Sequence, residues 1–181
     1  MVRFMAVLAL FALFAANGAM AQGAADLLAE AAERNPGRLE ARLLDLVAGF
    51  GGSEGLTGQG IEEHIALERS GARASALRRL LALDLDADGS VTRAELLVTQ
   101  RAASATGRGR LERHFAAADA DGDDRLTPDE IAAAGLAAGL TGLREAEAAL
   151  LRAALRLDGN GDGALTAEEV RTGLARLAPE V

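Results

Sequence analysis

Apolar residues recur at intervals of three and four positions along most of the chain, which is the spacing of one face of an α-helix. Short stretches rich in Asp, Asn and Gly separate these periodic segments. The pattern predicts helices at 24–34, 38–48, 61–69, 72–83, 96 to about 105, 111–118, 131 to about 139, 143–157 and 168–177. Because no long segment alternates in the manner of a strand, we expect an all-α fold.

The first 21 residues have a different pattern, that of a secretory signal peptide. Arg3 precedes an apolar run at 4–16, Asn17 and Gly18 end the run, and the residues up to Ala21 form an A-x-A cleavage site. A run of 13 residues is shorter than the roughly 20 that span a membrane. We therefore expect cleavage after this site and a periplasmic or secreted protein without a stable membrane anchor. A buried N-terminal helix and a signal anchor are the alternatives.

Three twelve-residue segments share one arrangement of acidic residues. They are DLDADGSVTRAE at 84–95, DADGDDRLTPDE at 119–130 and DGNGDGALTAEE at 158–169. Each has an acid or an amide at positions 1, 3 and 5, a branched apolar residue at position 8, Thr at position 9 and Glu at position 12. An Asp-rich surface turn, or the Thr-x-x-Glu box that caps a helix, would explain part of this pattern. Neither requires so many carboxylates, which repel one another unless a cation binds.

The three segments resemble the calcium-binding loop of the EF-hand superfamily, D-x-[DN]-x-[DN]-G-x5-E, and each lies between two predicted helices. The resemblance implies Ca²⁺ bound by side chains at positions 1, 3, 5 and 12, by a backbone carbonyl at position 7 and through water at position 9. It predicts three ions per chain. The residues that would hold them are Asp84, Asp86, Asp88, Ser90, Thr92, Glu95, Asp119, Asp121, Asp123, Arg125, Thr127, Glu130, Asp158, Asn160, Asp162, Ala164, Thr166 and Glu169.

Segment 119–130 departs from the loop pattern at position 6, where Asp124 replaces glycine. That position requires a positive φ, which glycine adopts freely and Asp adopts at some cost. Gly122 lies two residues earlier and does not replace the missing glycine. We therefore expect the weakest calcium affinity at this loop, and tighter binding at the loops that keep Gly89 and Gly163.

A fourth segment keeps the frame of the loop without its ligands. The 35-residue interval between the first two acidic segments leads back from Asp84 to Gly49, and segment 49–60 carries Leu56 at position 8 and Thr57 at position 9. Its ligand positions hold glycine or serine. We interpret this segment as a degenerate hand that cannot bind calcium with protein oxygens alone, and an ordinary Gly-rich linker is the alternative.

EF-hands form pairs, because the residues at position 8 join two loops in a short antiparallel ribbon. Succession along the chain predicts that Leu56 pairs with Val91 and that Leu126 pairs with Leu165. The glycines of 106–109 argue against one rigid helix between the pairs. We thus expect paired EF-hands in two lobes, in a calmodulin-like arrangement. The predicted divisions are a signal peptide at 1–21, a leading helix and turn at 22–37, one pair at 38–106 and another at 110–178.

Composition narrows the possible functions. The chain has no cysteine, which excludes disulfides and thiolate sites, and its two histidines are too few for a typical zinc or iron centre. A net charge of -8 disfavours nucleic acid as a partner. No Ser–His–Asp order, phosphate-binding loop or HExxH motif occurs, so we do not expect an enzyme.

Two roles for calcium binding remain. One is an exported calcium-binding or buffering protein, and the alternative is a calcium sensor that binds a dedicated protein partner. All 3 methionines lie within the first 21 residues. The exported chain would therefore lack the Met-rich groove with which promiscuous sensors bind their targets. The sequence favours the first role and identifies no protein partner.

Overall fold

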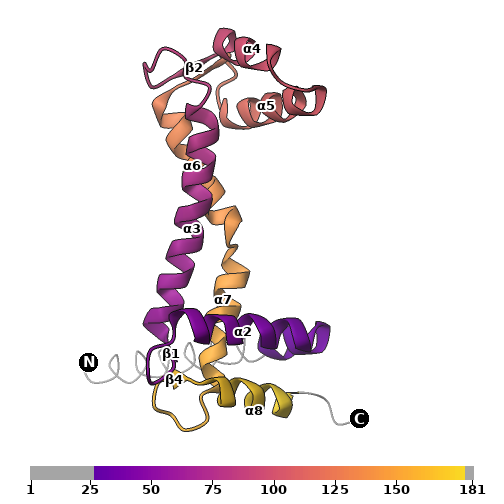
Figure 1. The fold of residues 1–181 in the computed structure, drawn as a ribbon, viewed down its shortest axis with the longest axis vertical. Coiled ribbons are helices and arrows are strands. Elements are labelled where there is room, and N and C mark those ends of the chain that lie inside the picture. Colours follow the sequence, from indigo (N-terminus) through magenta and orange to yellow (C-terminus); the bar gives the residue numbers. More distant parts are fainter. Residues whose placement is uncertain (1–26, 178–181) are drawn as a thin grey trace, which may run out of the picture. The chain divides into compact units, whose positions relative to one another are not determined.

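The computed structural model describes residues 27–177, which form an all-α fold of helices joined by four loops (Figure 1). The fold class predicted from the sequence is confirmed. The signal peptide predicted at 1–21 lies outside the described residues, as does the start of the predicted leading helix. Residues 27–34 of that helix are helical.

The described helices and strands follow the order expected for successive helix–loop–helix units. The helices are α2 (Pro36–Phe50), α3 (Gly58–Leu81), α4 (Arg93–Arg101), α5 (Ala105–Ala118), α6 (Pro128–Gly142), α7 (Glu145–Ala153) and α8 (Ala167–Leu177), with a 3₁₀ turn at Ala154–Leu157. The strands are β1 (Leu56–Thr57), β2 (Val91–Thr92), β3 (Arg125–Leu126) and β4 (Ala164–Leu165). Between residues 27 and 177, no helix combines the length and the apolar character needed to cross a membrane.

Side-chain caps explain where several helices begin. Thr92 and Thr127 each accept a hydrogen bond from the backbone N–H of a glutamate three residues later, and the glutamate carboxylate accepts one from the threonine N–H in return. This reciprocal capping box satisfies N–H groups that have no partner inside the helix. Asn35 caps α2 through its side-chain oxygen, with Pro36 as the first helical residue.

The four short strands join the loops in two pairs. β1 pairs antiparallel with β4, which places Leu56 opposite Leu165, and β2 pairs with β3, which places Val91 opposite Leu126. All four of these position-8 side chains are completely buried. The predicted pairing of Leu56 with Val91 and of Leu126 with Leu165 is therefore wrong, and the predicted divisions 38–106 and 110–178 were based on it.

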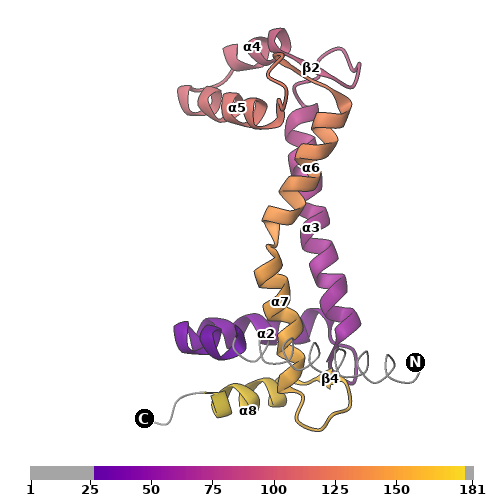
Figure 2. The ribbon, with the colours of Figure 1, turned by 180° about the vertical axis from the view of Figure 1, so that it is seen from behind.

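Each strand pair belongs to a compact unit of its own. We call the unit of β1 and β4 the outer pair (27–64 with 145–177) and the unit of β2 and β3 the inner pair (Ile65–Arg144). In the outer pair α2 packs against α8, and in the inner pair α4 packs against α5 (Figures 1 and 2). The hands that pair are thus the first with the fourth and the second with the third.

One continuous helix prevents the first two loops from pairing. α3 runs through Gly71, where the sequence predicted a break between helices at 61–69 and 72–83. Glycine weakens a helix interior by about 1 kcal/mol relative to alanine, but α3 packs closely against α6 here. A Cβ on Gly142 would lie only 2.4 Å from the Cβ of Ala72. Because this contact supports the helix, the chain does not reverse between β1 and β2.

A tight turn between α4 and α5 allows the next two loops to pair. α5 begins at Ala105, and the Ser104 hydroxyl accepts a hydrogen bond from the N–H of Gly107. The sequence predicted an interruption at 106–109, but these residues are helical and the break lies at 102–104. Reversal at this turn places α4 beside α5 and β2 beside β3.

Apolar packing holds the end of each loop that leads into the following helix. In the inner pair, Phe115 is 1% exposed and packs in a cluster with Leu80, Leu83, Val91, Leu96, Ala118, Leu126 and Ile131. The residue that follows position 12 is buried in every hand, namely Ile61, Leu96, Ile131 and Val170. The position-12 residue is therefore attached to a backbone that is fixed by the core.

Candidate metal centre

Loop 84–95 gathers three carboxylates around one point. The side-chain oxygens of Asp84, Asp86 and Asp88 lie within 4.8 Å of one another. Backbone N–H groups hold them there: Asp84 accepts a hydrogen bond from Gly89 at 3.0 Å, and Asp88 accepts one from Ser90 at 2.7 Å. Side-chain-to-backbone bonds of this kind fold the loop tightly and bring its acids together.

Glu95 closes the same loop from the first turn of α4. One carboxylate oxygen accepts a hydrogen bond from the N–H of Leu85 at 2.7 Å. The other accepts bonds from the N–H and the hydroxyl of Thr92, both at 2.7 Å. Position 12 is thus attached to positions 2 and 9 of its own loop, so its carboxylate joins the start of the loop to its end.

Loops 119–130 and 158–169 repeat this network at the same positions. Position 1 accepts a hydrogen bond from the N–H of position 6, at 3.2 Å for Asp119 and 2.9 Å for Asp158. Position 12 accepts one from the N–H of position 2, at 2.9 Å for Glu130 and 3.1 Å for Glu169. In both loops position 5 also accepts from position 7. The three loops therefore share one backbone shape.

The loops differ in their number of carboxylates. Asp119, Asp121 and Asp123 form a second group whose oxygens lie within 4.8 Å of one another. In loop 158–169 the middle position is Asn160, whose amide oxygen accepts a hydrogen bond from the N–H of Asp162 at 2.8 Å. An amide oxygen is a calcium ligand too, but it carries no charge.

Two non-glycine residues of the acidic loops have a positive φ, Asp124 as expected and Ala87 in addition. Asp124 at position 6 has φ +65°, and Gly89 and Gly163 at the same position have φ +84° and +85°. The prediction that Asp124 adopts a positive φ is confirmed. Ala87, at position 4 of loop 84–95, also has a positive φ of 61°. Sequence reasoning missed it, although the two other acidic loops carry glycine at position 4.

The network keeps the position-12 carboxylates ionised. Hydrogen bonds from the Thr92 N–H, the Thr92 hydroxyl and the Leu85 N–H lower the pKa of Glu95 from 4.5 to about 2. The pKa of Glu130 is lowered to about 2 by the corresponding donors, with the Thr127 N–H first. The pKa of Glu169 is lowered in the same way, chiefly by the N–H of Thr166. Three anionic carboxylates are therefore available to a cation at neutral pH.

Loop 49–60 keeps the frame of a hand and lacks the network. Strand β1 and a hydrogen bond from the N–H of Gly60 to the hydroxyl of Thr57 at 3.2 Å are retained. α2 extends into the loop as far as Phe50, so a Cβ at Gly60 would lie 2.9 Å from the Phe50 carbonyl oxygen. An ordered strand that pairs with β4 argues for a degenerate hand over a flexible linker.

Two arginines connect the loops of the inner pair. The loop pattern predicts only a backbone role for Arg125, but its guanidinium donates a hydrogen bond to the Ser90 hydroxyl at 2.9 Å. In the opposite direction, Arg93 Nε lies 3.9 Å from a carboxylate oxygen of Asp124. Sequence reasoning missed both contacts, because they depend on which loops pair.

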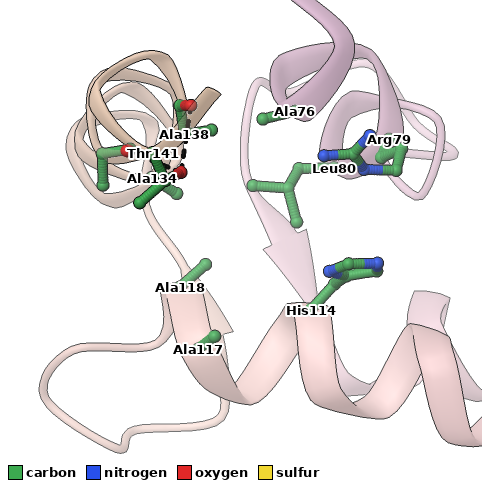
Figure 3. Close-up of a pocket in the computed structure, with 10 residues that line it drawn as sticks. Ala76, Arg79, Leu80, His114, Ala117, Ala118, Ala134, Ala138 and Thr141 are labelled. Carbon is green, nitrogen blue, oxygen red and sulfur yellow. Dashed lines mark hydrogen bonds between the residues drawn. The ribbon is translucent and has the colours of Figure 1, made fainter. Parts of the chain in front are cut away.

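A pocket of about 220 Å³ lies in the inner pair among α3, α5 and α6 (Figure 3). Alanines from all three helices form most of its wall, and Arg79 and His114 stand at one side (Figure 3). Burial, followed by the positive charges of Arg79, Arg110 and Arg113, lowers the pKa of His114. The pocket therefore combines an apolar wall with a cationic edge.

The donor groups of the acidic loops fit calcium. They offer only oxygens, several of them anionic, which is what a hard cation with 6–8 oxygen ligands requires. The structure brings together the predicted ligands of loops 84–95 and 119–130 as groups of three carboxylates, with the position-12 glutamates at the same loops. Ser90, Arg125 and Ala164 each donate their N–H to position 5.

Comparison with known proteins supports an EF-hand at loop 158–169, the acidic loop without a group of three carboxylates. The family model of the EF hand matches residues 155–175, which include all of loop 158–169. No curated protein and no solved structure matches the chain significantly. An EF-hand calcium-binding protein fits these findings. The family match and the two carboxylate groups support calcium binding at different loops, and neither depends on the other.

Acidification should weaken the metal-free protein. Glu95 and Glu130 have folded-state pKa values of about 2, below the ordinary 4.5. The stability they contribute is complete above pH 4.5 and is lost as the pH falls towards 2. We expect the melting temperature in calcium-free buffer to fall across this window, and to fall less steeply in Glu95→Gln. Circular dichroism melts measure this, with exposed Glu33→Gln as the control; identical profiles for all three proteins would contradict the expectation.

Proposed function

We propose that the protein binds three calcium ions, one at each of the loops 84–95, 119–130 and 158–169. One observation carries the proposal, namely that the same network of N–H groups and carboxylates recurs in all three loops. Positions 1, 3, 5 and 12 would supply side-chain oxygens, position 7 a carbonyl and position 9 a water-mediated contact. Loop 49–60 would bind none.

Calcium binding should stabilise the protein strongly. The chain carries a net charge of -8, and much of its negative charge is confined to short loops. A ligand that binds only the folded state stabilises it by RT ln(1 + [L]/Kd), about 2.7 kcal/mol per site at 100 times Kd. The ions would also relieve the repulsion among the carboxylates that each loop brings together.

We further propose that the protein is exported, is not an enzyme, and serves to bind or buffer calcium outside the cytoplasm. The pattern of residues 1–21 supports export. Calcium outside the cytoplasm is not reduced to cytosolic levels, and extracellular EF-hand modules bind with Kd values of about 10⁻⁴–10⁻³ M. The strained Asp124 of loop 119–130 is consistent with a weak site.

A second candidate function is calcium-dependent binding of a dedicated partner, and the surface of the inner pair favours it. The large apolar side chains that stand exposed within residues 27–177 all belong to this unit: Leu67, Leu81, Leu85, Leu97, Val98, Leu136 and Leu140. The pocket of Figure 3 lies in the same unit. A contiguous patch of exposed apolar side chains commonly marks an interaction site.

Native mass spectrometry should find three bound calcium ions in the parent protein. Glu95→Gln, Glu130→Gln and Glu169→Gln should each bind two, because glutamine can still cap the helix but cannot supply two anionic oxygens. Glu33→Gln, an exposed change outside the loops, should still bind three. Four ions in the parent would refute the degenerate loop, and an unchanged count in Glu169→Gln would refute that site.

Export should remove the first 21 residues. The intact mass of the protein recovered from outside the cytoplasm should correspond to a chain that starts at Gln22. Recovery of the whole chain from the cytoplasm, with Met1 retained, would contradict the proposed location.

A hydrophobic dye can separate buffering from partner binding. For a buffer, we expect dye fluorescence that calcium leaves unchanged, since the apolar side chains are already exposed. Leu136→Gln combined with Leu140→Gln should lower that fluorescence at either calcium level. A large calcium-dependent increase, lost in the double variant, would instead favour the second candidate function.

A further inference from the structure

Arg125 extends out of its own loop and contacts loop 84–95. Its Nη2 donates a hydrogen bond to the Ser90 hydroxyl at 2.9 Å and lies 3.7 Å from a carboxylate oxygen of Asp88. The register of β2 and β3, in which Arg125 lies opposite Thr92, brings the side chain to this place. Ser90 is 4% exposed and is the one buried polar residue within 27–177, so its hydroxyl gives the guanidinium a fixed anchor.

Calcium ligation does not require this contact. Position 7 of an EF-hand loop contributes a backbone carbonyl, and the three acidic loops carry Ser90, Arg125 and Ala164 there. The side chain of Arg125 therefore acts on the neighbouring loop. Its target, Asp88, occupies position 5, which is a side-chain ligand position of that loop.

We propose that Arg125 lowers the calcium affinity of loop 84–95 by holding a positive charge against Asp88. The inference rests on the proposed calcium binding of this loop. Two cations that share one carboxylate are roughly 6 Å apart, and their repulsion in water, reduced by salt, weakens binding about three- to tenfold. Without calcium, the same guanidinium relieves repulsion among the loop aspartates. Stabilising the metal-free state lowers the affinity further.

Of the two arginines that cross between the loops of the inner pair, only Arg125 meets a ligand position. Arg93 makes the reciprocal contact with Asp124, and its N–H donates to the Asp124 carbonyl at 3.1 Å. Asp124 occupies position 6, which supplies no ligand, so Arg93 offsets an additional acid and does not compete for one. In the outer pair, the residue at position 7 of the partner loop is Gly55, which has no side chain to extend towards loop 158–169.

A calcium titration of the full chain followed by ¹H–¹⁵N NMR tests the proposal loop by loop. The N–H of Gly89 donates to Asp84 and that of Gly163 donates to Asp158, so these two amide signals report different loops. For Arg125→Gln, we expect the Gly89 midpoint at an about three- to tenfold lower calcium concentration. The Gly163 midpoint should not move. A Gly89 midpoint equal to or above the parent value would overturn the proposal.

Three more variants separate charge from structure. Arg125→Lys keeps the charge and should stay near the parent midpoint. Ser90→Ala removes the anchor but keeps the backbone carbonyl, and should shift the midpoint in the same direction as Arg125→Gln; alanine already occupies this position in loop 158–169. Arg108→Gln removes one exposed charge near the start of α5 and should leave Gly89 unchanged. An equal shift of the Gly89 midpoint in Arg108→Gln would show that the shift follows from net charge alone, and would overturn the proposal.

Stability without calcium gives a second readout. Arg125→Gln should melt at a lower temperature in EDTA, because the loop acids lose a counter-charge, and its difference from the parent should shrink as salt is added. If Arg125→Gln failed to fold, Ser90→Ala and Arg125→Lys would decide the question. If the parent Gly89 signal did not respond to calcium, the proposed calcium binding of this loop would be wrong, and the role of Arg125 with it.

Discussion

Repulsion among carboxylates confined to a twelve-residue loop is the constraint on which the rest of this structure depends. Two such charges 4 Å apart repel by about 4 kcal/mol at an effective dielectric constant of 20. Each loop opposes this with backbone N–H groups directed at positions 1, 5 and 12. That arrangement requires a positive φ at position 6, which is why Asp124 accepts the same strained conformation as the glycines. The loop backbone is therefore shaped by its acids before any ion is considered.

The pairing of the strands determines which loops are adjacent, and therefore which charged side chains come into contact. In the inner pair, two acidic loops lie side by side. Arg93 of one loop contacts Asp124 of the other, and Arg125 of the second contacts Asp88 of the first. In the outer pair, an acidic loop lies beside a loop whose one acid is Glu54, and the position-7 residues are Gly55 and Ala164. The arginines thus occur in the pair where negative charge is most concentrated. The same register that buries Val91 and Leu126 also places Arg125 against loop 84–95.

The loops could be predicted from the sequence because their chemistry is local. Spacing alone identifies the acids, the capping threonines and the positive φ of Asp124, and all of these interactions form within twelve residues. The pairing could not be predicted in this way. It depends on whether α3 breaks at Gly71, and packing of α3 against α6 at Ala72 overrides the weak local signal of that glycine. The side-chain role of Arg125 was missed for the same reason, since it exists only once β2 meets β3.

Loop 49–60 shows how a helix can occupy part of the frame of a hand. α2 extends to Phe50, so the segment that corresponds to the start of an acidic loop is helical here. A Cβ at Gly51, which is position 3, would lie 2.3 Å from the Val47 carbonyl oxygen, whereas one at Gly49, which is position 1, would meet nothing within 4 Å. An acid could therefore return at position 1 without a clash, but an acid at position 3 could not while α2 keeps its last turn. A fourth site would therefore require the last turn of α2 to unwind in addition to the return of the acids.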